Sequence, residues 1–152
     1  MKKAILLLED GSIFHGASIG ISGVTCGEIV FNTSMTGYQE ILSDPSYSKQ
    51  IINFTYPHIG NVGINKEDAE SHRIWAAGVI MRQLSTFASN WRSEQTLTEY
   101  LKSNQVVGIA DIDTRNLAQK LRIQGTLNGC IMAENIDERK AKLHLRSFKG
   151  LV

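Results

Sequence analysis

The feature that most constrains this sequence is a polar segment between two strand-like runs, within Gly27–Asn65. The flanking runs, Glu28–Phe31 and Gln50–Tyr56, are rich in the β-branched and aromatic residues that favour strands. Asn, Thr, Ser, Gln and Asp side chains with no evident packing role dominate the segment between them. Rigid strands that carry a polar loop are a common way for proteins to hold binding groups. We therefore expect the main functional groups here.

Short apolar runs and helical patterns alternate along the rest of the chain. Strands are expected at Ala4–Leu8, Ser12–Ile19, Cys26–Phe31, Gln50–Thr55, Trp75–Met81, Val106–Ala110 and Leu127–Ala133. Helices are expected at Tyr38–Leu42 (one turn), Ser93–Asn104 with a Thr96–Glu99 capping box, Thr114–Gln124 and Asp137–Phe148, and a surface turn at Lys66–His72. The Asp10-Gly11 pair predicts a hairpin turn, Asp113 an N-cap and Gly125 a helix end. Together these elements predict a mixed α/β domain with layered sheets and helices packed on one side.

The composition is that of a globular protein of one domain, residues 1–152. A net charge of +1 gives no electrostatic reason to expect nucleic acid or an acidic membrane as a partner. No apolar run approaches the ~20 residues of a membrane span, and no signal peptide is evident. Cys26 and Cys130 show no spacing pattern, which favours reduced thiols and a cytoplasmic location. One disulfide between them is the alternative.

Two long motifs carry a resemblance to a known family. GEIVFNTSMTGYQEILSDPSYS…TYPHIGNVG, from Gly27 to Gly63, and GIADIDTRNLAQKLRIQGTLNGCI, at Gly108–Ile131, resemble the N-terminal domain of the small, glutamine-hydrolysing subunit of carbamoyl phosphate synthetase. The resemblance covers nearly the whole chain, from the LEDG turn at Leu8–Gly11 to Phe148. It implies a layered β/β/α "swivelling" fold with mixed sheets. It also implies that a C-terminal glutaminase domain is absent from this segment.

The resemblance further implies a function for the complete subunit. That subunit would hydrolyse glutamine and pass ammonia to the large subunit of a heterodimer, a ligase and glutamine amidotransferase. The large subunit would use ATP and Mg to make carbamoyl phosphate for arginine and pyrimidine biosynthesis, in the cytoplasm. No cofactor and no metal are expected in this segment, whose expected partners are the large subunit, the glutaminase domain and, through the complete subunit, glutamine.

Ser46 is the one residue here for which the resemblance implies a substrate contact. It lies in the Asp44-Pro45-Ser46-Tyr47 motif, whose serine reaches the glutamine site of the C-terminal domain in the family. Pro45 fixes its own φ and stiffens the loop, and a serine hydroxyl both donates and accepts hydrogen bonds. The alternative is a turn serine that bonds only its own backbone.

No catalytic residue is expected in this segment, because neither cysteine lies in the Gly-x-Cys-x-Gly pattern of a nucleophile elbow. Each of the two cysteines lies inside a strand-like run, so we interpret both as small packing residues. Asp111 and Asp113 could suggest a metal pair, but an N-cap explains Asp113 more simply. The remaining candidates are partner contacts or solvated charges on the helix, at Arg115 and Arg122, and groups that order the loop or line an interdomain surface, at Asn32, Thr33, Thr36 and Gln39.

Two alternatives from other functional classes stay open at this point. One is a stand-alone binding or assembly module that regulates a synthetase without being part of a glutaminase. The other is a small hydrolase that uses Cys26 or Ser46 with a spatially adjacent histidine such as His58. The four histidines show no metal-ligand spacing.

Overall fold

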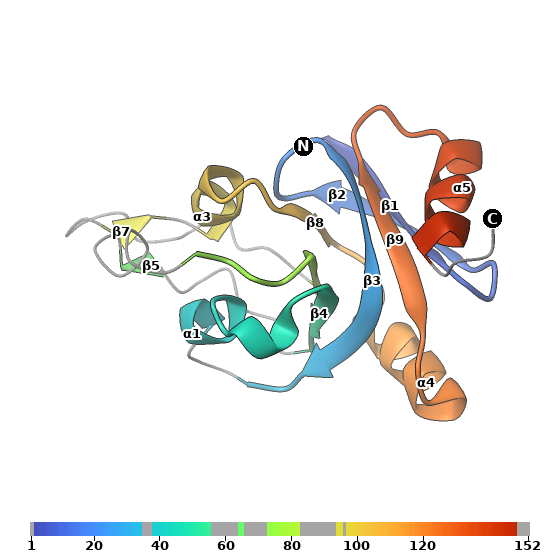
Figure 1. Cartoon of the computed structure of the whole chain (residues 1–152), viewed down its shortest axis with the longest axis horizontal. Helices are drawn as coiled ribbons and strands as arrows, with labels where there is room; N and C mark the ends of the chain where they lie inside the picture. The colour runs from blue at the N-terminus through green and yellow to red at the C-terminus, as the bar shows by residue number, and fades with distance from the viewer. Residues whose placement is uncertain are drawn as a thin grey trace.

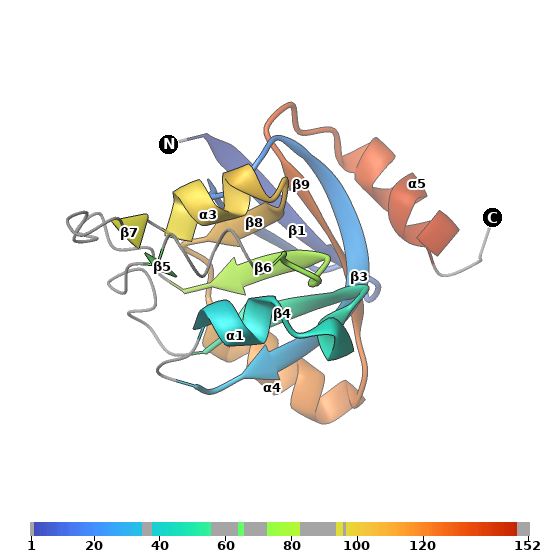
Figure 2. The ribbon, with the colours of Figure 1, turned by 60° about the vertical axis from the view of Figure 1, so that its left-hand side comes forward.

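The computed structural model describes residues 2–34, 38–55, 64–65, 73–82, 94–95 and 97–148. Seven strands form a closed barrel in the order β1-β2-β8-β6-β4-β3-β9, in which β9 pairs again with β1 (Figures 1 and 2). Their bounds are β1 Lys3–Leu8, β2 Ile13–Ser18, β3 Gly23–Asn32, β4 Gln50–Phe54, β6 Gly78–Met81, β8 Val107–Ala110 and β9 Asn128–Ala133. A separate pair joins β5 (Ile64–Asn65) to β7 (Glu94–Gln95).

The barrel combines two kinds of strand pairing. The pairs β3–β4, β4–β6 and β6–β8 are parallel. The pairs β1–β2, β1–β9, β2–β8 and β3–β9 are antiparallel. The antiparallel hairpin of β1 and β2 turns at Asp10-Gly11, where Gly11 takes a φ of +91° that favours glycine. Parallel pairing instead requires a crossover between strands, and the segment from β3 to β4 is such a crossover.

Within the described ranges, four helices surround the barrel: α1 Tyr38–Leu42, α3 Leu97–Ser103, α4 Thr114–Gln124 and α5 Glu138–Phe148. Leu42 of α1 and Tyr100 of α3 pack on the outer face of β4, β6 and β8. Leu145 of α5 packs on the outer face of β1 and β9. Leu117 of α4 instead packs with the inward-facing residues, so α4 closes one end of the barrel (Figure 1).

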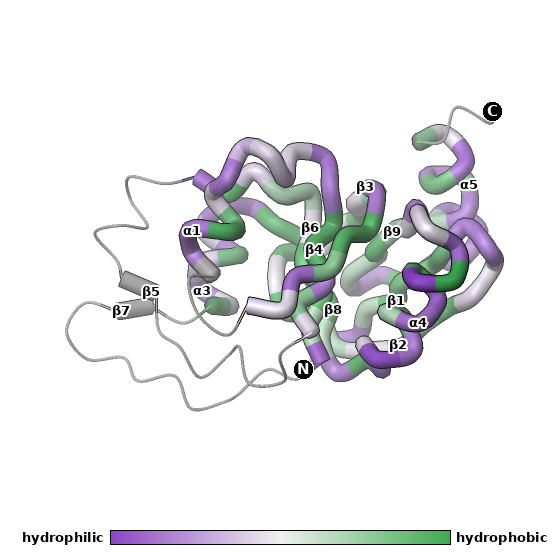
Figure 3. The backbone as a smooth tube through the Cα atoms, turned by 90° about the horizontal axis from the view of Figure 1, so that it is seen from below, coloured by the Kyte–Doolittle hydropathy of each residue, from purple (hydrophilic) through white to green (hydrophobic). Residues whose placement is uncertain are grey.

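Alternation along the strands decides which side chains fill the interior. In β1, Leu6 and Leu8 point inward with Ile29 of β3, whereas Ile5 and Leu7 point outward beneath α5. Both sides are buried, so β1 is apolar over five consecutive positions rather than alternating with polar residues. In Figure 3 the hydrophobic colour gathers on β4 and β6, while α4 and α5 alternate with hydrophilic positions.

The mixed α/β class expected from the sequence is confirmed, but the layering is different. The sheet closes on itself, and the helices lie on two outer faces and one end rather than on one side. The expected strand at Trp75–Met81 is wrong in its first half, since β6 begins at Gly78 and Trp75 is 36% exposed. The expected helix start at Ser93 is also wrong, because Glu94 and Gln95 pair with β5 and the helix begins at Leu97.

Other expected elements agree with the structure, α4 most closely. Its predicted range, its Asp113 cap and its Gly125 end are all confirmed, with the Asp113 carboxylate accepting a hydrogen bond from Asn116 N at 3.1 Å. Asp137 likewise caps α5 through Lys140 N at 3.2 Å. The expected turn at Lys66–His72 and Thr96 of the capping box lie outside the described residues.

Candidate functional site

Ser46 lies in the crossover that joins β3 to β4, in a short 3₁₀ turn at Pro45–Tyr47. The turn follows α1, whose Leu42 is fully buried and holds the crossover against the barrel. The turn ends at Ser48, just before the amino end of β4. Ser46 itself is exposed. The structure thus places the predicted substrate-contact residue at the surface, where its hydroxyl is accessible.

Asp44 fixes the backbone of this turn. Its carboxylate accepts a hydrogen bond from Ser46 N at 2.9 Å and acts as the N-cap of the turn. The pKa of Asp44 lies below its usual value because the Ser46 backbone N–H, and then the Ser46 hydroxyl, donate hydrogen bonds to the carboxylate. The carboxylate therefore stays ionised at neutral pH and keeps the turn formed. Within this chain the Ser46 hydroxyl bonds the Asp44 carboxylate, whereas the alternative from the sequence was a turn serine that bonds only its own backbone.

Tyr47 anchors the turn to the end of β3. Its ring is partly buried against the outer core, and its hydroxyl accepts a hydrogen bond from Asn32 Nδ2 at 3.3 Å. Asn32 Oδ1 also accepts from Ser34 N at 2.8 Å. Asn32 therefore connects the beginning of the crossover to the Ser46 turn, which is the loop-ordering role that the sequence suggested for it.

Backbone geometry after the turn is unusual at Lys49, which adopts a φ of +66°. This left-handed conformation is costly for a residue other than glycine, asparagine or aspartate. Across the pair of strands, a Cβ built on Gly27 would lie 2.7 Å from the Lys49 carbonyl oxygen. Glycine at position 27 therefore gives the Lys49 backbone room to enter β4 in this conformation.

An exposed aromatic side chain borders the Ser46 turn. The segment before β6 runs beside the turn, with Trp75 N donating to the Leu42 carbonyl at 3.0 Å and Ala76 bridging to Ser48. The Arg73 guanidinium stacks 4.1 Å from the centre of the Trp75 ring. Tryptophan and arginine are the residue types most enriched at the energetic centres of protein interfaces.

Three arginines line a cleft of about 230 Å³ beyond the carboxyl ends of the parallel strands. Arg82 follows β6, and Arg115 and Arg122 lie on α4. Thr33 and Thr55, which follow β3 and β4, line the same cleft. None of the three guanidinium groups makes an ion pair with another described residue. The cleft can accept an anionic group, because arginine binds carboxylates and phosphates through two parallel hydrogen bonds.

The structure separates the residues singled out from the sequence into two places. Asn32, the last residue of β3, donates a hydrogen bond to Tyr47 of the Ser46 turn, whereas the next residue, Thr33, lines the arginine cleft together with Arg115 and Arg122. Gln39 lies on α1, where its backbone carbonyl accepts a hydrogen bond from the Ser43 hydroxyl at 2.8 Å. Thr36 and His58 lie outside the described residues. Sequence reasoning missed Arg82, although polar residues that follow parallel strands are expected to converge at one edge.

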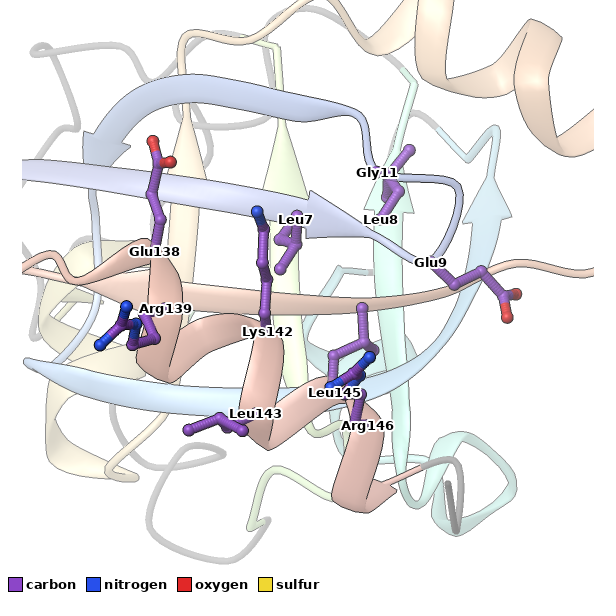
Figure 4. A pocket seen from close by; sticks show the side chains of 10 residues that line it. All are labelled: Leu7, Leu8, Glu9, Gly11, Glu138, Arg139, Lys142, Leu143, Leu145 and Arg146. Atoms are coloured by element: carbon purple, nitrogen blue, oxygen red, sulfur yellow. The ribbon is translucent and has the colours of Figure 1, made fainter. Parts of the chain in front are cut away.

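A third surface lies on the other side of the barrel. A groove of about 620 Å³ runs between β1 and α5, with Leu7 and Leu145 lining it (Figure 4). Arg139, Lys142 and Arg146 line its helix side. The described residues around it include no cysteine, serine or histidine, so the groove itself carries no nucleophile.

Asp111 and Asp113 do not act as a pair. Asp113 caps α4, while Asp111 takes a φ of +65° and donates its N–H to the Arg82 carbonyl at 3.1 Å. Among the residues that the structure describes, no group of three or more His, Cys, Asp or Glu side chains is arranged to hold a metal ion. Within the same residues, no helix has the length and apolarity required to cross a membrane.

Both cysteines are free thiols, as expected from the sequence, and both lie in strands. Cys130 is fully buried with Ile5 and Leu7, which agrees with a packing role. Taken together, the described residues define a closed-barrel domain that displays polar loops around its rim.

Comparison with known proteins identifies the family. The sequence profile of the carbamoyl-phosphate synthase small chain, CPSase domain, matches residues 6–131. Proteins named carbamoyl phosphate synthase small chain are 60% identical over 151 residues in Vibrio cholerae and in Pseudomonas putida, and 59% identical over 152 residues in Pseudomonas aeruginosa. The chain belongs to the carbamoyl-phosphate synthase small chain family.

The match covers 99% of this chain but only 40% of each of these relatives. Among solved structures, a peptidase M28 precursor from Shewanella amazonensis aligns with 87% of this chain and 34% of its own, with 11% identity and a TM-score of 0.46. That likeness is too weak to support any inference about fold or activity.

Proposed function

We propose that this chain is the domain of a carbamoyl phosphate synthase small subunit that presents Ser46 to the glutamine site of a glutaminase domain. The observation that carries the proposal is the exposed Ser46 on a turn fixed by Asp44, in a chain that belongs to this family. The segment itself has no catalytic residue in this proposal, and it is inactive on its own. Its role is to position the Ser46 hydroxyl and to bind the glutaminase domain and the large subunit.

The complete protein would act as a glutamine amidotransferase. The small subunit hydrolyses glutamine to glutamate and ammonia, and the ammonia passes to the large subunit. There, bicarbonate, ammonia and two molecules of ATP with Mg give carbamoyl phosphate for arginine and pyrimidine biosynthesis. ATP and Mg belong to the large subunit, and the reaction takes place in the cytoplasm.

Ser46 acts in this proposal through binding and not through covalent chemistry. The Asp44 hydrogen bond and the fixed φ of Pro45 hold the Ser46 backbone before substrate arrives, so little conformational entropy is lost on binding. The hydroxyl can leave the exposed Asp44 carboxylate and bond a polar end of glutamine. Loss of such a contact weakens substrate binding, so it raises KM more than it lowers kcat.

Two surfaces would hold the partners. Trp75 with the stacked Arg73 lies beside the Ser46 turn, which suits a contact with the glutaminase domain that shares the glutamine site. The arginine cleft lies at the far end of the parallel strands and suits an acidic group of the large subunit. A contact between the arginine cleft and the large subunit would be the partner contact that the sequence suggested as one role for Arg115 and Arg122.

The test of the Ser46 proposal uses the complete small subunit with its large subunit. Ser46→Ala should lower kcat/KM for glutamine about tenfold, the loss expected for one hydrogen bond to a charged substrate. Synthesis driven by free ammonia should stay unchanged, because it bypasses the glutamine site. Ser48→Ala is the matched control, since Ser48 is an exposed serine at the end of the same turn. Equal glutamine kinetics for the two variants would reject the role of Ser46.

Docking at the arginine cleft needs a separate test. The double variant Arg115→Glu with Arg122→Glu should weaken association with the large subunit about tenfold or more. The double variant Arg139→Glu with Arg146→Glu changes the net charge equally on the opposite groove and should leave association unchanged. If both variants weaken association to the same degree, the cleft is not the docking site.

The two alternatives are less favoured. Relatives about 60% identical to this chain are named as small chains of the synthase, which does not favour a stand-alone module. A small hydrolase based on Cys26 or Ser46 predicts glutamine turnover by the isolated 152-residue chain. We expect no turnover, and turnover abolished by Ser46→Ala would establish the hydrolase instead.

A further inference from the structure

The two cysteines of this chain lie opposite each other on neighbouring strands. They are 104 positions apart in the sequence, yet Cys26 of β3 and Cys130 of β9 are direct partners in the antiparallel register. The register is continuous from Gly23 with Ala133 to Glu28 with Asn128. A continuous register of six residue pairs between β3 and β9 therefore fixes Cys26 opposite Cys130.

The hydrogen-bond pattern of these strands identifies the type of pair. Directly opposed residues of an antiparallel ladder alternate between hydrogen-bonded and non-hydrogen-bonded pairs. Ile29 N donates to the Leu127 carbonyl at 2.8 Å, so the position just beyond the register is of the hydrogen-bonded type. Counting three pairs back makes Cys26 and Cys130 a non-hydrogen-bonded pair. Such pairs have Cα atoms about 4.5 Å apart, within the range of about 4.4–6.8 Å found in disulfides.

Both side chains lie on the outer face of the barrel, beneath α5. Cys130 is fully buried in a cluster with Leu7 and Leu145, and Cys26 lies at the edge of that cluster, partly exposed. Leu7 and Leu145 also line the groove between β1 and α5, where Figure 4 shows them facing the same space. Neither cysteine lines that groove, but Cys26 is itself partly exposed, so a small oxidant can reach it, while helix α5 covers the fully buried Cys130.

We infer that Cys26 and Cys130 form an oxidative modification site, in which a peroxide converts the two thiols reversibly into a disulfide between β3 and β9. The inference rests on the strand register and on the shared face of the two side chains. It is independent of the role proposed for Ser46, which lies on a different face of the barrel.

The chemistry takes two steps. The Cys26 thiolate attacks one oxygen of hydrogen peroxide, the O–O bond breaks, and Cys26 becomes a sulfenic acid with release of water after proton transfer. The Cys130 sulfur then attacks the Cys26 sulfur, a second water leaves, and the disulfide forms. Two electrons pass from the two thiols to one peroxide molecule. A dithiol reductant reverses the reaction by thiol–disulfide exchange.

Local electrostatics assign the order of the two cysteines. The pKa of Cys26 lies below its usual value because Cys130 donates a hydrogen bond to it, an effect that outweighs partial burial. The pKa of Cys130 is raised by the same hydrogen bond, by burial and by the neighbouring Cys26 charge. Cys26 is therefore the peroxide-reactive thiol and Cys130 the resolving thiol.

The experiment treats the purified reduced chain with equimolar hydrogen peroxide, blocks remaining thiols with an alkylating agent under denaturing conditions, and records intact mass and peptide maps. We expect loss of two hydrogen atoms, no alkylation, one peptide pair joining Cys26 to Cys130, and full reversal by dithiothreitol. The linked chain should also melt about 5–15 °C higher, because the disulfide closes a loop of about 100 residues in the unfolded state.

Two variants separate this site from ordinary thiol oxidation. Cys130→Ala should leave Cys26 as a sulfenic acid that dimedone traps, and Cys26→Ala should leave the buried Cys130 unreactive at the same peroxide dose. Oxidation of the unmodified chain to a sulfinic acid at Cys26 with Cys130 still alkylated, or to dimers joined between chains, would overturn the inference. The measurement on the unmodified chain decides this even if Cys130→Ala does not fold.

Discussion

Asn32 Nδ2 donates a hydrogen bond to the Tyr47 hydroxyl at 3.3 Å, which ties the end of β3 to the turn that carries Ser46. The two residues are 15 positions apart and hold the two ends of the crossover together. Tyr47→Phe should therefore lower the free energy of unfolding by about 0.5–1.5 kcal/mol, the usual net value of one such bond. Urea denaturation followed by circular dichroism measures this loss.

The matched control for that prediction is Ser46→Ala, which removes an exposed hydroxyl and its bond to the exposed Asp44 carboxylate but keeps the Ser46 N–H bond that caps the turn. It should change stability by less than about 0.5 kcal/mol. If Tyr47→Phe is equally neutral, the Asn32 bond does not help to hold the turn in solution.

Substitutions at Gly27 and Lys49 should change the stability of the chain in opposite directions. A Cβ at position 27 would lie 2.7 Å from the Lys49 carbonyl oxygen and 3.3 Å from Ile51 Cγ1, so Gly27→Ala should destabilise the chain by about 1–3 kcal/mol. Lys49→Gly relieves the left-handed backbone at φ +66° and should stabilise it by up to about 1 kcal/mol. Thermal melting of both variants tests the pair. A loss of stability in Lys49→Gly would show that the lysine side chain matters more than the backbone conformation.

The ionisation of Asp10 should make the stability of the chain depend on pH. Burial alone would raise its pKa, but hydrogen bonds from Ser12 and Gln124 and the charge of Lys120 outweigh burial and lower the pKa from 3.8 to about 2. A carboxylate with a lowered folded-state pKa stabilises the fold above its unfolded pKa, and this contribution is lost as pH falls from about 4 to about 2. Asp10→Asn should thus cost about 1 kcal/mol at pH 7, after allowance for solvent screening, and almost nothing near pH 2.

Unfolding by urea at both pH values checks the Asp10 prediction. The matched variant Gln124→Ala removes one of the hydrogen bonds and keeps the charge of Asp10, so it should reproduce part of the loss at pH 7. An Asp10→Asn penalty that persists unchanged at pH 2 would contradict the assignment.

Replacing Asn53 by an apolar residue of similar shape should stabilise the chain. It is fully buried on β4, and neither its Oδ1 nor its Nδ2 has a hydrogen-bond partner in the described part of the chain. A buried polar group without a partner costs about 1–3 kcal/mol, so Asn53→Leu, which has nearly the same shape, should raise the free energy of unfolding. Asn53→Ala should lower it, because it leaves a cavity. Destabilisation by both variants would mean that the amide has a role in the folded chain.

Local signals in the sequence were sufficient to predict individual elements. Asp113 and Gly125 mark the two ends of α4 because a cap and a left-handed helix end are decided by residues within one turn. Asp10-Gly11 likewise predicts the first hairpin. The helix start at Ser93 failed because Glu94 and Gln95 pair with a distant strand, which outweighs helical preference.

Long-range pairing decided what the sequence could not predict. Closure of the barrel depends on β9 joining both β1 and β3, and no local pattern records which strands become neighbours. The opposition of Cys26 to Cys130 and the convergence of Arg82 with Arg115 follow from the same pairing. Ser46 was found by motif resemblance alone, and its contact with glutamine stays a prediction.

The position of β9 between β1 and β3 has a consequence for synthesis of the protein. Leu7 of the first strand pairs with Cys130 of the last one, so a nascent chain cannot complete the barrel until nearly all of the described sequence has left the ribosome. Until then β1 and β3 each lack a neighbour, and the apolar run of β1 has an unpaired edge that can associate with other chains. Folding should therefore be slow for a chain of this size, as is usual when contacts join distant residues. We expect the nascent chain to be most prone to aggregation just before Ala133 emerges.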